Sequence, residues 1–435
     1  MGRQPFGLAS PAAWLRVAGW DVVCADVAKE KLADSAIAEA DLVGFHLPMH
    51  TATRLAAPVV SRVRQLNSRA RLCAYGLYAP LNADWLRSIG VGAIFGGEFE
   101  ADLARWADGS QIEDSPRPGP SVPRVHFLIP DRRGLPPLSR YATLQMPDGD
   151  RRLVAYTEAT RGCKHRCRHC PVVPVYDGQF RVVPPEVVLA DIETQIAGGA
   201  AHVTFGDPDF LNGPAHAMRI VDALHAAHPH VTYDATIKIE HLLKHRDLLE
   251  RLVSTGCLFV TSAVESVDDR VLATLDKGHT RQDFVAAVEL CRAAGLTLSP
   301  TFVAFHPWLT LEGYCDFLDL IVALDLVDHV ASIQLAIRLL VPEGSLLLTT
   351  PEMRPYIGHF DPVTLTHRWT HPDARVDGLQ QTVGAIVGAR VNADRRAVFE
   401  EISTLAHDRA GRPMPRSRPA RDRATVPYLN EPWYC

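Results

Sequence analysis

The sequence contains no stretch of about 18 uninterrupted apolar residues, the length a membrane-spanning helix requires. It also lacks a secretory leader, because the N-terminus does not combine a charged start, an apolar run and a small-residue cleavage site. Neither sign of charge dominates, and a formal net charge of -5 gives no reason to expect nucleic-acid binding. These absences predict a cytoplasmic protein with no membrane partner.

A disulfide framework is absent as well. The nine cysteines are an odd number, and most of them are scattered along the chain. Five lie in apolar patterns, where cysteine behaves as a small hydrophobic residue: Cys24, Cys73, Cys257, Cys291 and Cys315. With 435 residues, 47% of them hydrophobic and 22% charged, the chain has the composition of a soluble globular protein of two or three domains. The cysteine usage predicts a reducing compartment.

Three cysteines depart from this scatter. Cys163, Cys167 and Cys170 form a CxxxCxxC motif inside the short basic segment Thr157–Gly178. Thiolates this close together can converge on one metal centre, and thiolate is the ligand of iron–sulfur clusters. A four-iron cluster held by three cysteines leaves one iron without a protein ligand. A zinc site made of the three cysteines and one histidine, His165 or His169, is the alternative.

This spacing, in this context, resembles the radical S-adenosylmethionine (SAM) superfamily. In that family the fourth iron chelates the amino and carboxylate groups of SAM, and an electron from the cluster cleaves the sulfonium to give a radical. The resemblance implies an enzyme with a [4Fe-4S] cluster and SAM as cofactors, where the protein positions the reactive group. It also implies a small-molecule substrate and an electron-donor protein of the flavodoxin or ferredoxin type.

The segment from 151 to 348 repeats strand, loop and helix. This pattern predicts a partial (βα)6 barrel of the TIM type, with its working face at the carboxyl ends of the strands. The cysteine loop directly follows the first expected strand. The six expected strands are Leu153–Thr157, Ala201–Phe205, Thr232–Ile237, Leu258–Ala263, Thr297–Ala304 and Ser332–Arg338.

A glycine-rich acidic turn follows the second expected strand. The family resemblance implies that Gly206, Asp207, Pro208 and Asp209 bind the amino group of SAM. Gly206 allows a close approach of the backbone, and either aspartate can accept hydrogen bonds from an ammonium group. A plain Asp-Pro turn is the alternative reading of these residues.

Other expected strand ends carry further candidates. Thr236 and Lys238 follow the third strand, and Lys238 either meets the SAM carboxylate or is an ordinary charge at a strand end. Ser262 and Glu265 resemble the family's turn near the ribose hydroxyls. Thr301 lies at the fifth strand end, followed by Pro307 and Trp308, where Trp308 narrows the substrate pocket or caps the barrel. His169 takes the position at which relatives carry an aromatic residue beside the adenine.

The cysteine loop is flanked by positive charge. Arg161, Lys164, Arg166 and Arg168 can tune the cluster potential, receive an acidic reductant protein, or simply form a solvated basic loop.

Residues 1–109 predict a doubly wound α/β domain, with strands at Asp21–Asp26, Leu42–His46, Ala70–Tyr75 and Ala93–Gly96. The domain resembles the cobalamin-binding type in Ala18–Asp21, Ala40–Gly44 and Gly96–Glu100. The DxHxxG signature is absent, and His46 and His50 are more typical of surface residues than of cobalt ligands, so cobalamin binding stays open. The first strand of such a domain is also missing, which predicts that the natural chain starts upstream.

The remaining segments are a linker and bridging segment at 110–150, a helical region at 349–407 and a flexible Arg/Pro-rich tail at 408–435. The tail ends in Cys435 and resembles a group of radical SAM proteins that end in Cys-Cys or Cys-selenocysteine followed by Ala-Glu-Pro. The resemblance implies a possible selenoprotein whose selenocysteine codon was read as a stop. Cys435 would then serve catalysis as a redox thiol or bind a soft metalloid such as arsenic.

The sequence leaves the reaction open. Hydrogen abstraction, cobalamin-assisted methyl transfer and aminocarboxypropyl transfer all belong to the enzyme interpretation. A non-catalytic, zinc-stabilised binding protein is the alternative from another class.

Overall fold

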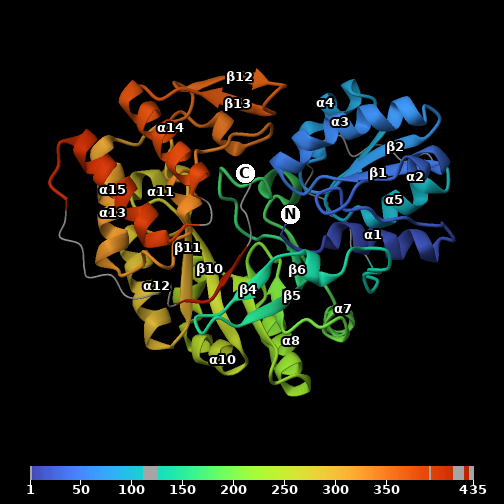
Figure 1. The fold of residues 1–435 in the computed structure, drawn as a ribbon, viewed down its shortest axis with the longest axis horizontal. Helices are drawn as coiled ribbons and strands as arrows, with labels where there is room; N and C mark the ends of the chain where they lie inside the picture. The colour runs from blue at the N-terminus through green and yellow to red at the C-terminus, as the bar shows by residue number, and fades with distance from the viewer. Residues whose placement is uncertain (1, 111–125, 391–392, 415–425, 431–435) are drawn as a thin grey trace.

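The computed structural model describes residues 2–110, 126–390, 393–414 and 426–430. They form an N-terminal α/β unit, a larger sheet with helices packed around it, and a C-terminal helical region on the far side of that sheet (Figure 1). None of the described helices has the length and apolar character to cross a bilayer.

The N-terminal unit is built on a parallel sheet of β1 (Leu42–His46), β2 (Arg71–Tyr75) and β3 (Ala93–Phe95), in that order. Alternate side chains of a strand point to opposite faces, and β2 follows this rule. Leu72 and Ala74 enter one core cluster, whereas Cys73 and Tyr75 enter another. The helices are α1 (Phe6–Val17), α2 (Asp34–Glu39), α3 (His50–Leu66), α4 (Ala83–Ser88) and α5 (Glu100–Ala107).

The strand expected at Asp21–Asp26 is wrong. These residues form no strand, and the side chain of Val23 is 74% exposed. Arg16 in α1 donates a hydrogen bond to the carbonyl of Val22 at 2.8 Å, so this backbone is held by a neighbouring side chain and not by a sheet. Two adjacent valines suggested a strand, but no partner strand covers them.

The main sheet has the order β11-β10-β9-β8-β5-β4-β14. Its five parallel strands confirm five of the six expected barrel strands and the partial barrel: β5 (Arg151–Thr157), β8 (His202–Phe205), β9 (Thr232–Thr236), β10 (Cys257–Glu265) and β11 (Thr297–Phe302). The accompanying helices are α7 (Pro185–Ala197), α8 (Pro214–Ala227), α9 (Ile239–Lys244), α10 (Leu249–Ser254), α11 (Asp269–Leu275), α12 (Arg281–Ala293) and α13 (Leu311–Ala323).

The sixth expected strand is wrong in type. Ser332–Leu335 is a 3-10 helix, and Arg338 contributes only an isolated bridge to Phe305. The reason lies at the edge of β11, where the backbone N–H of Phe302 donates to the side chain of Gln334 at 2.9 Å. A side chain therefore takes the hydrogen bond that a sixth strand would have accepted.

Two short segments extend the opposite edge of the sheet. β4 (Thr143–Gln145) runs antiparallel to β5, and β14 (Tyr428–Leu429) runs antiparallel to β4. Part of the bridging segment expected at 110–150 therefore belongs to the sheet. The flexible tail expected at 408–435 is wrong for residues 428–429, which form β14. Arg395 also lies over the ring of Tyr428, 4.6 Å from its centroid.

The C-terminal region confirms the expected helices as α14 (Ala374–Ala389) and α15 (Arg395–Ala410). Their buried faces belong to the same core as the barrel helices, because Leu379 and Ile402 join its cluster. α15 packs against α13 and α14 packs against α15, and Figure 1 shows both on the side of the sheet away from the N-terminal unit. The hairpin of β12 (Ile357–Asp361) and β13 (Thr366–Trp369) was not expected from the sequence.

A buried arginine ties the start of the chain to the barrel. Arg132 binds both carboxylate oxygens of Asp191 on α7, at 2.7 and 2.8 Å. It also donates to the Tyr156 carbonyl at 2.6 Å and to Gln4 at 2.8 Å. The side chains of Arg132 and Asp191 are 7% and 1% exposed, so each charge depends on the other.

Arg132→Met should lower the free energy of unfolding by about 3–5 kcal/mol, because it leaves the Asp191 carboxylate buried and unpaired. Urea denaturation followed by circular dichroism measures the change. Arg133→Met is the matched control: the neighbouring side chain is 76% exposed and pairs with Asp131, so its midpoint should stay nearly unchanged. Equal midpoints for the two variants would contradict the stabilising role of Arg132.

Candidate functional site

A small hairpin carries the cysteine loop away from the carboxyl end of β5. Its strands are β6 (Thr160–Gly162) and β7 (Phe180–Val182), and the loop ends in the short helix α6 (Val173–Tyr176). Gly162 has a φ of +77°, and a Cβ atom there would lie 2.4 Å from the ring of Tyr176. The turn into Cys163 therefore requires glycine.

The three cysteines lie in this loop. Cys163 and Cys167 are buried, and Cys170 is half-buried. Burial raises the pKa of Cys163 to about 11 and that of Cys170 to about 12, and the charge of Cys167 adds to both rises. A metal centre deprotonates a coordinating thiol outright, so these mutually repelling thiols are suited to a metal cluster.

The spacing of the cysteine sulfurs distinguishes an iron–sulfur cluster site from a zinc site. Tetrahedral zinc with Zn–S bonds near 2.3 Å holds its sulfurs roughly 3.8 Å apart. Across the described ranges, the one group of three candidate ligands whose atoms all lie within 4.8 Å of one another is His165, Asp209 and His241, and it includes no cysteine. Wider spacing fits a cluster, in which each sulfur binds a different iron.

The two histidines of the loop each contact a carboxylate. His169 Nε2 lies 3.0 Å from Glu265, and His165 Nε2 faces Asp209 at 3.5 Å. No set of three cysteines and one histidine with metal-ligand spacing is found among the described residues, so the alternative Cys3His zinc site has no support in this arrangement.

The loop is anchored from both sides. Arg168 donates from its backbone to the Leu275 carbonyl at 2.9 Å and from its guanidinium to the Thr274 carbonyl at 3.0 Å, both on α11. Asn212 accepts from the backbone of Lys164 at 3.3 Å and lies 3.9 Å from the Cys163 sulfur. Sequence reasoning missed Asn212, although it lies only three residues after the acidic turn that follows β8.

Two of the candidates from the strand ends are buried near the site. One contacts a cysteine, and the other has an unpaired hydroxyl. Lys238 is buried, with its ammonium 3.8 Å from the Cys167 sulfur and 3.5 Å from Glu240. Ser262 is fully buried on β10, and its hydroxyl has no hydrogen-bond partner among the described residues. An unpaired buried hydroxyl is costly, so it marks a position where a ligand group would be accepted.

Glu265 ends β10 with a φ of +70°. Burial acts to raise its pKa, but the Lys277 ammonium at 3.6 Å and His169 outweigh it and hold the pKa to about 2. The carboxylate is therefore ionised and can accept hydrogen bonds from hydroxyl groups. His169 and Glu265 act as a pair, which the sequence did not predict.

The acidic turn after β8 has a different arrangement from the one expected. Asp207 accepts from the Ala159 N–H at 3.0 Å and from the Thr160 hydroxyl at 2.6 Å, and burial raises its pKa to about 6. Its carboxylate thus holds the entrance of the cysteine loop. Gly206 is required by Tyr156, because a Cβ atom would lie 2.0 Å from that hydroxyl.

Asp209 points toward two histidines, and its contact with an ammonium group of SAM stays a prediction. Its carboxylate lies 2.6 Å from His241 and 3.5 Å from His165. Burial opposes the ionised form, but both histidines outweigh it and lower the pKa of Asp209 to about 2.

The remaining strand-end candidates share the same edge of the sheet. Thr236 ends β9 and is paired with Thr261 of β10, whereas Thr301 on β11 is paired with Ala263. Pro208 lies half-buried between the two aspartates of its turn. No side-chain hydrogen bond or ion pair of these described residues assigns them a role.

The basic flank of the loop is divided by burial. Arg161 is 7% exposed and forms ion pairs with Glu98 at 3.2 Å, Glu100 at 2.6 Å and Glu158 at 3.0 Å. Tyr176 donates to Glu98 at 3.1 Å. Arg161 therefore joins the N-terminal unit to the cysteine loop and is not a solvated charge.

The other basic residues of the flank behave differently. Arg166 pairs with Asp177 at 2.7 Å and remains 59% exposed. Lys164 reaches the Asn212 carbonyl at 3.5 Å.

The strand ends of the N-terminal unit, where open α/β sheets bind ligands, face this loop. His46 stacks on Tyr75, with ring centroids 5.5 Å apart, and His50 Nε2 contacts the Thr364 carbonyl at 2.5 Å. The edge also shares one core cluster with α6, through Tyr78, Leu81, Val175 and Tyr176. These residues fit direct packing and not a cobalt ligand set, so we assign no step to cobalamin.

The turn after β11 is closed by the C-terminal segment. Trp308 donates to the Glu352 carbonyl at 3.1 Å and packs against a cluster that includes Leu339 and Met353. Of the two expectations for Trp308, this contact favours a cap of the barrel. Cys435 and the expected selenocysteine tail lie outside the described residues.

Residues 157–321 match the family model described as "Radical SAM superfamily". This match confirms the predicted radical SAM enzyme domain, and domains of this family use a [4Fe-4S] cluster and SAM. The matched segment begins at the end of β5 and includes all three loop cysteines.

Two curated relatives align with much of the same region. A tRNA-2-methylthio-N(6)-dimethylallyladenosine synthase of Chlorobium phaeobacteroides is 27% identical over 169 residues, 37% of this chain and 37% of the relative. A bacteriochlorophyllide d C-8(2)-methyltransferase of Chlorobaculum tepidum is 28% identical over 169 residues, 37% of this chain and 36% of the relative. The alignments thus span little more than a third of these relatives.

Two solved structures share the wider fold. The radical SAM methyltransferase TsrM from Kitasatospora setae, with cobalamin and [4Fe-4S] cluster bound, has a TM-score of 0.59 at 18% identity and covers 74% of this chain and 71% of its own. The cobalamin-dependent SAM radical enzyme OxsB has a TM-score of 0.62 at 13% identity and covers 86% and 64%. They confirm the predicted fold class.

Replacing Cys163, Cys167 or Cys170 singly by alanine should remove both iron and acid-labile sulfide from anaerobically reconstituted protein, because each sulfur binds a separate iron. Cys291→Ala is the control, since that thiol is buried in the hydrophobic core. Metal analysis and a sulfide assay measure the outcome. Wild-type protein that holds zinc and no sulfide would contradict the cluster.

His306, at the turn after β11, should make stability depend on pH. It is 4% exposed, and burial lowers its pKa to about 4. The unfolded chain therefore binds more protons between about pH 4 and 6.5, so His306 contributes its full stability above pH 6.5 and loses it as the pH falls through that window.

At pH 5.0 the loss should reach about 2 kcal/mol relative to pH 7.5. His306→Gln, which cannot titrate, should reduce the difference between urea denaturations at these pH values by that amount. His359→Gln, at an exposed histidine, should leave the difference unchanged. An unaltered difference in H306Q would show that His306 is not held neutral by the fold.

Proposed function

We propose that this chain is a radical SAM enzyme that holds a [4Fe-4S] cluster on Cys163, Cys167 and Cys170 and cleaves SAM reductively to act on a small-molecule substrate. The observation that best supports this proposal is that three free thiols lie on one loop, which follows β5 at the carboxyl edge of a parallel half-barrel. When bound, the cluster and SAM supply an electron and a cleavable sulfonium.

The residues of the chain then have separable tasks. Lys238 places a buried positive charge beside Cys167, which offsets thiolate charge and is suited to a SAM carboxylate. Glu265 offers an ionised carboxylate, held by Lys277 and His169, to ribose hydroxyls. Ser262 adds a buried hydroxyl on the same strand. The surrounding core excludes water, which strengthens each of these contacts.

Within this class, methyl transfer has the support of the comparisons. The Chlorobaculum tepidum relative and TsrM are both described as methyltransferases. At the packed edge of the N-terminal unit, His46 stacks on Tyr75 and His50 contacts the Thr364 carbonyl, and neither contact is that of a cobalt ligand. We therefore propose methylation only as the second candidate, after hydrogen abstraction from the substrate.

The reaction also needs an electron from outside the chain. We propose an electron donor of the flavodoxin or ferredoxin type, for which the exposed Arg166 on the cysteine loop offers positive charge. A soft metalloid such as arsenic remains a proposed substrate that depends on Cys435 alone.

Anaerobically reconstituted protein, reduced with dithionite and given SAM, should form 5′-deoxyadenosine, which mass spectrometry detects. Cys167→Ala should form none. Glu265→Gln should bind SAM more weakly while keeping its iron and sulfide, because it loses the ionised acceptor and not a cluster ligand.

The identity of the product decides between the reaction classes. Methylthioadenosine in place of deoxyadenosine would indicate aminocarboxypropyl transfer. S-adenosylhomocysteine formed together with deoxyadenosine would indicate methylation. No nucleoside product from protein with a complete cluster would refute reductive cleavage of SAM.

A further inference from the structure

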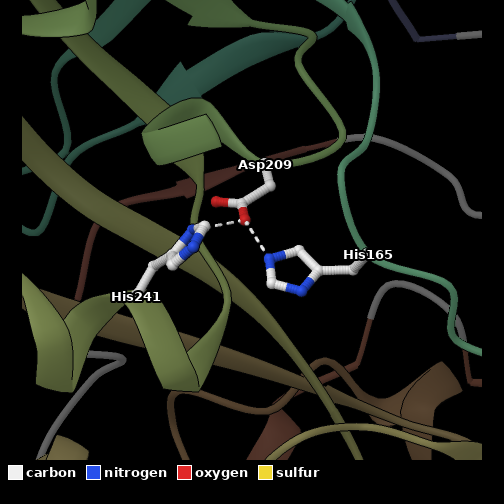
Figure 2. Close-up of side chains that lie close together, drawn as sticks. All are labelled: His165, Asp209 and His241. Atoms are coloured by element: carbon white, nitrogen blue, oxygen red, sulfur yellow. Dashed lines mark ion pairs between the residues drawn. The ribbon is translucent and has the colours of Figure 1, made fainter. Parts of the chain in front are cut away.

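We propose that His165, Asp209 and His241 bind one divalent transition-metal ion, Zn²⁺ or Fe²⁺, beside the cysteine loop. This site is separate from the cluster and does not depend on the proposed reaction. Figure 2 shows the three side chains pointing toward one another, with the Asp209 carboxylate between the two imidazoles.

Three different parts of the fold bring the ligands together. His165 lies in the cysteine loop, Asp209 in the turn after β8, and His241 on α9. Their ligating atoms all lie within 4.8 Å of one another. Asp209 Oδ2 is the shared point, 2.6 Å from His241 Nδ1 and 3.5 Å from His165 Nε2.

The backbone orients the carboxylate. Asp209 precedes the 3-10 helix Phe210–Asn212, and its Oδ1 accepts from the N–H of Leu211 at 3.3 Å. That bond occupies one oxygen and leaves Oδ2 for the histidines. The ligand is thus fixed before any ion binds, which reduces the entropy lost on binding.

Burial without hydrogen bonding is the second observation. Asp209 and His241 are both fully buried, with relative exposures of 0%. Asp209 Oδ2, His165 Nε2 and both ring nitrogens of His241 are buried atoms with no hydrogen bond of acceptable geometry. Each such group costs about 1–3 kcal/mol when nothing satisfies it. One cation satisfies the carboxylate and one nitrogen of each imidazole together.

The ligand types select the metal. Two imidazoles and one carboxylate leave open positions, as in catalytic zinc sites and in non-haem Fe²⁺ sites. Calcium and magnesium prefer oxygen ligands and do not fit two imidazoles.

The proposed ligand His165 also has a second carboxylate, that of Glu240, near its other ring nitrogen. Glu240 Oε2 is 3.6 Å from the Nδ1 atom of His165, on the side away from Asp209. Metal-bound histidines typically direct their second nitrogen to such a group, which sets the tautomer.

The position of the site suggests what it does. Because His165 lies between Cys163 and Cys167, a metal on it joins the cysteine loop to the ends of β8 and β9. Asn212, three residues after Asp209, also contacts the Cys163 sulfur. The ion therefore positions the loop and adds positive charge beside the thiolates.

Cobalt binding tests the site in a background that cannot form the cluster. The variant Cys163→Ser/Cys167→Ser/Cys170→Ser is treated with chelator, titrated with Co²⁺ and followed by visible absorption. One equivalent should bind. Adding Asp209→Ala or His241→Ala should weaken binding by more than the roughly 10- to 100-fold typical of losing a group that only hydrogen-bonds to a metal ligand.

His245→Ala is the matched control. This imidazole caps α9 with its ring 5.6 Å from that of His241, yet it is not a member of the triad. Cobalt binding should persist in H245A. Two outcomes would overturn the proposal: a folded triple-serine variant that binds no cobalt, or cobalt binding that is equal in H241A and H245A. Either would show that the three side chains contact one another without binding a metal.

If the triple-serine variant does not fold, the metal site is tested by metal analysis of protein that keeps all three cysteines. Zinc, or iron in excess of the acid-labile sulfide, should amount to one equivalent and disappear in H241A but not in H245A. Absence of that extra metal from wild-type protein would overturn the metal site. A complete cluster with no extra ion would leave the proposed SAM chemistry intact, so the two proposals can fail separately.

Discussion

The buried guanidinium of Arg161 is the constraint on which the arrangement of the site depends. It lies at the start of the cysteine loop and meets carboxylates from both α/β units, Glu98 and Glu100 on one side and Glu158 on the other. Burying these charges is favourable only while they remain together. The ion pairs therefore define where the loop leaves β5, and Gly162 and Cys163 follow directly.

Around this fixed point, polar groups at the sheet edge fall into two kinds. Asp207 has both oxygens engaged within the chain, and it holds the loop entrance. Ser262 and His241 are equally buried, but among the described residues the Ser262 hydroxyl and both ring nitrogens of His241 make no hydrogen bond of acceptable geometry. Because an unpaired buried polar group is destabilising, the first kind builds the scaffold and the second marks where ligands belong.

The N-terminal unit packs against the cysteine loop. Its strand ends, which bind ligands in many open α/β sheets, here share a core cluster with α6 of the cysteine loop. Solved structures with a similar overall fold carry cobalamin. In this chain the same kind of unit is packed directly against the loop, and its acidic residues after β3 hold Arg161.

The sequence by itself determined the half-barrel, five of its strands, the helical character of the C-terminal region and the three cysteines, because these are encoded in local periodicity and close spacing. Tertiary structure decided what depends on distant partners. Gln334 replaces a sixth strand, Glu98 reaches Arg161 across 63 positions, and Asp209 meets His165 and His241. Such pairings leave no local pattern, since they arise only when separate strand ends are brought to one edge.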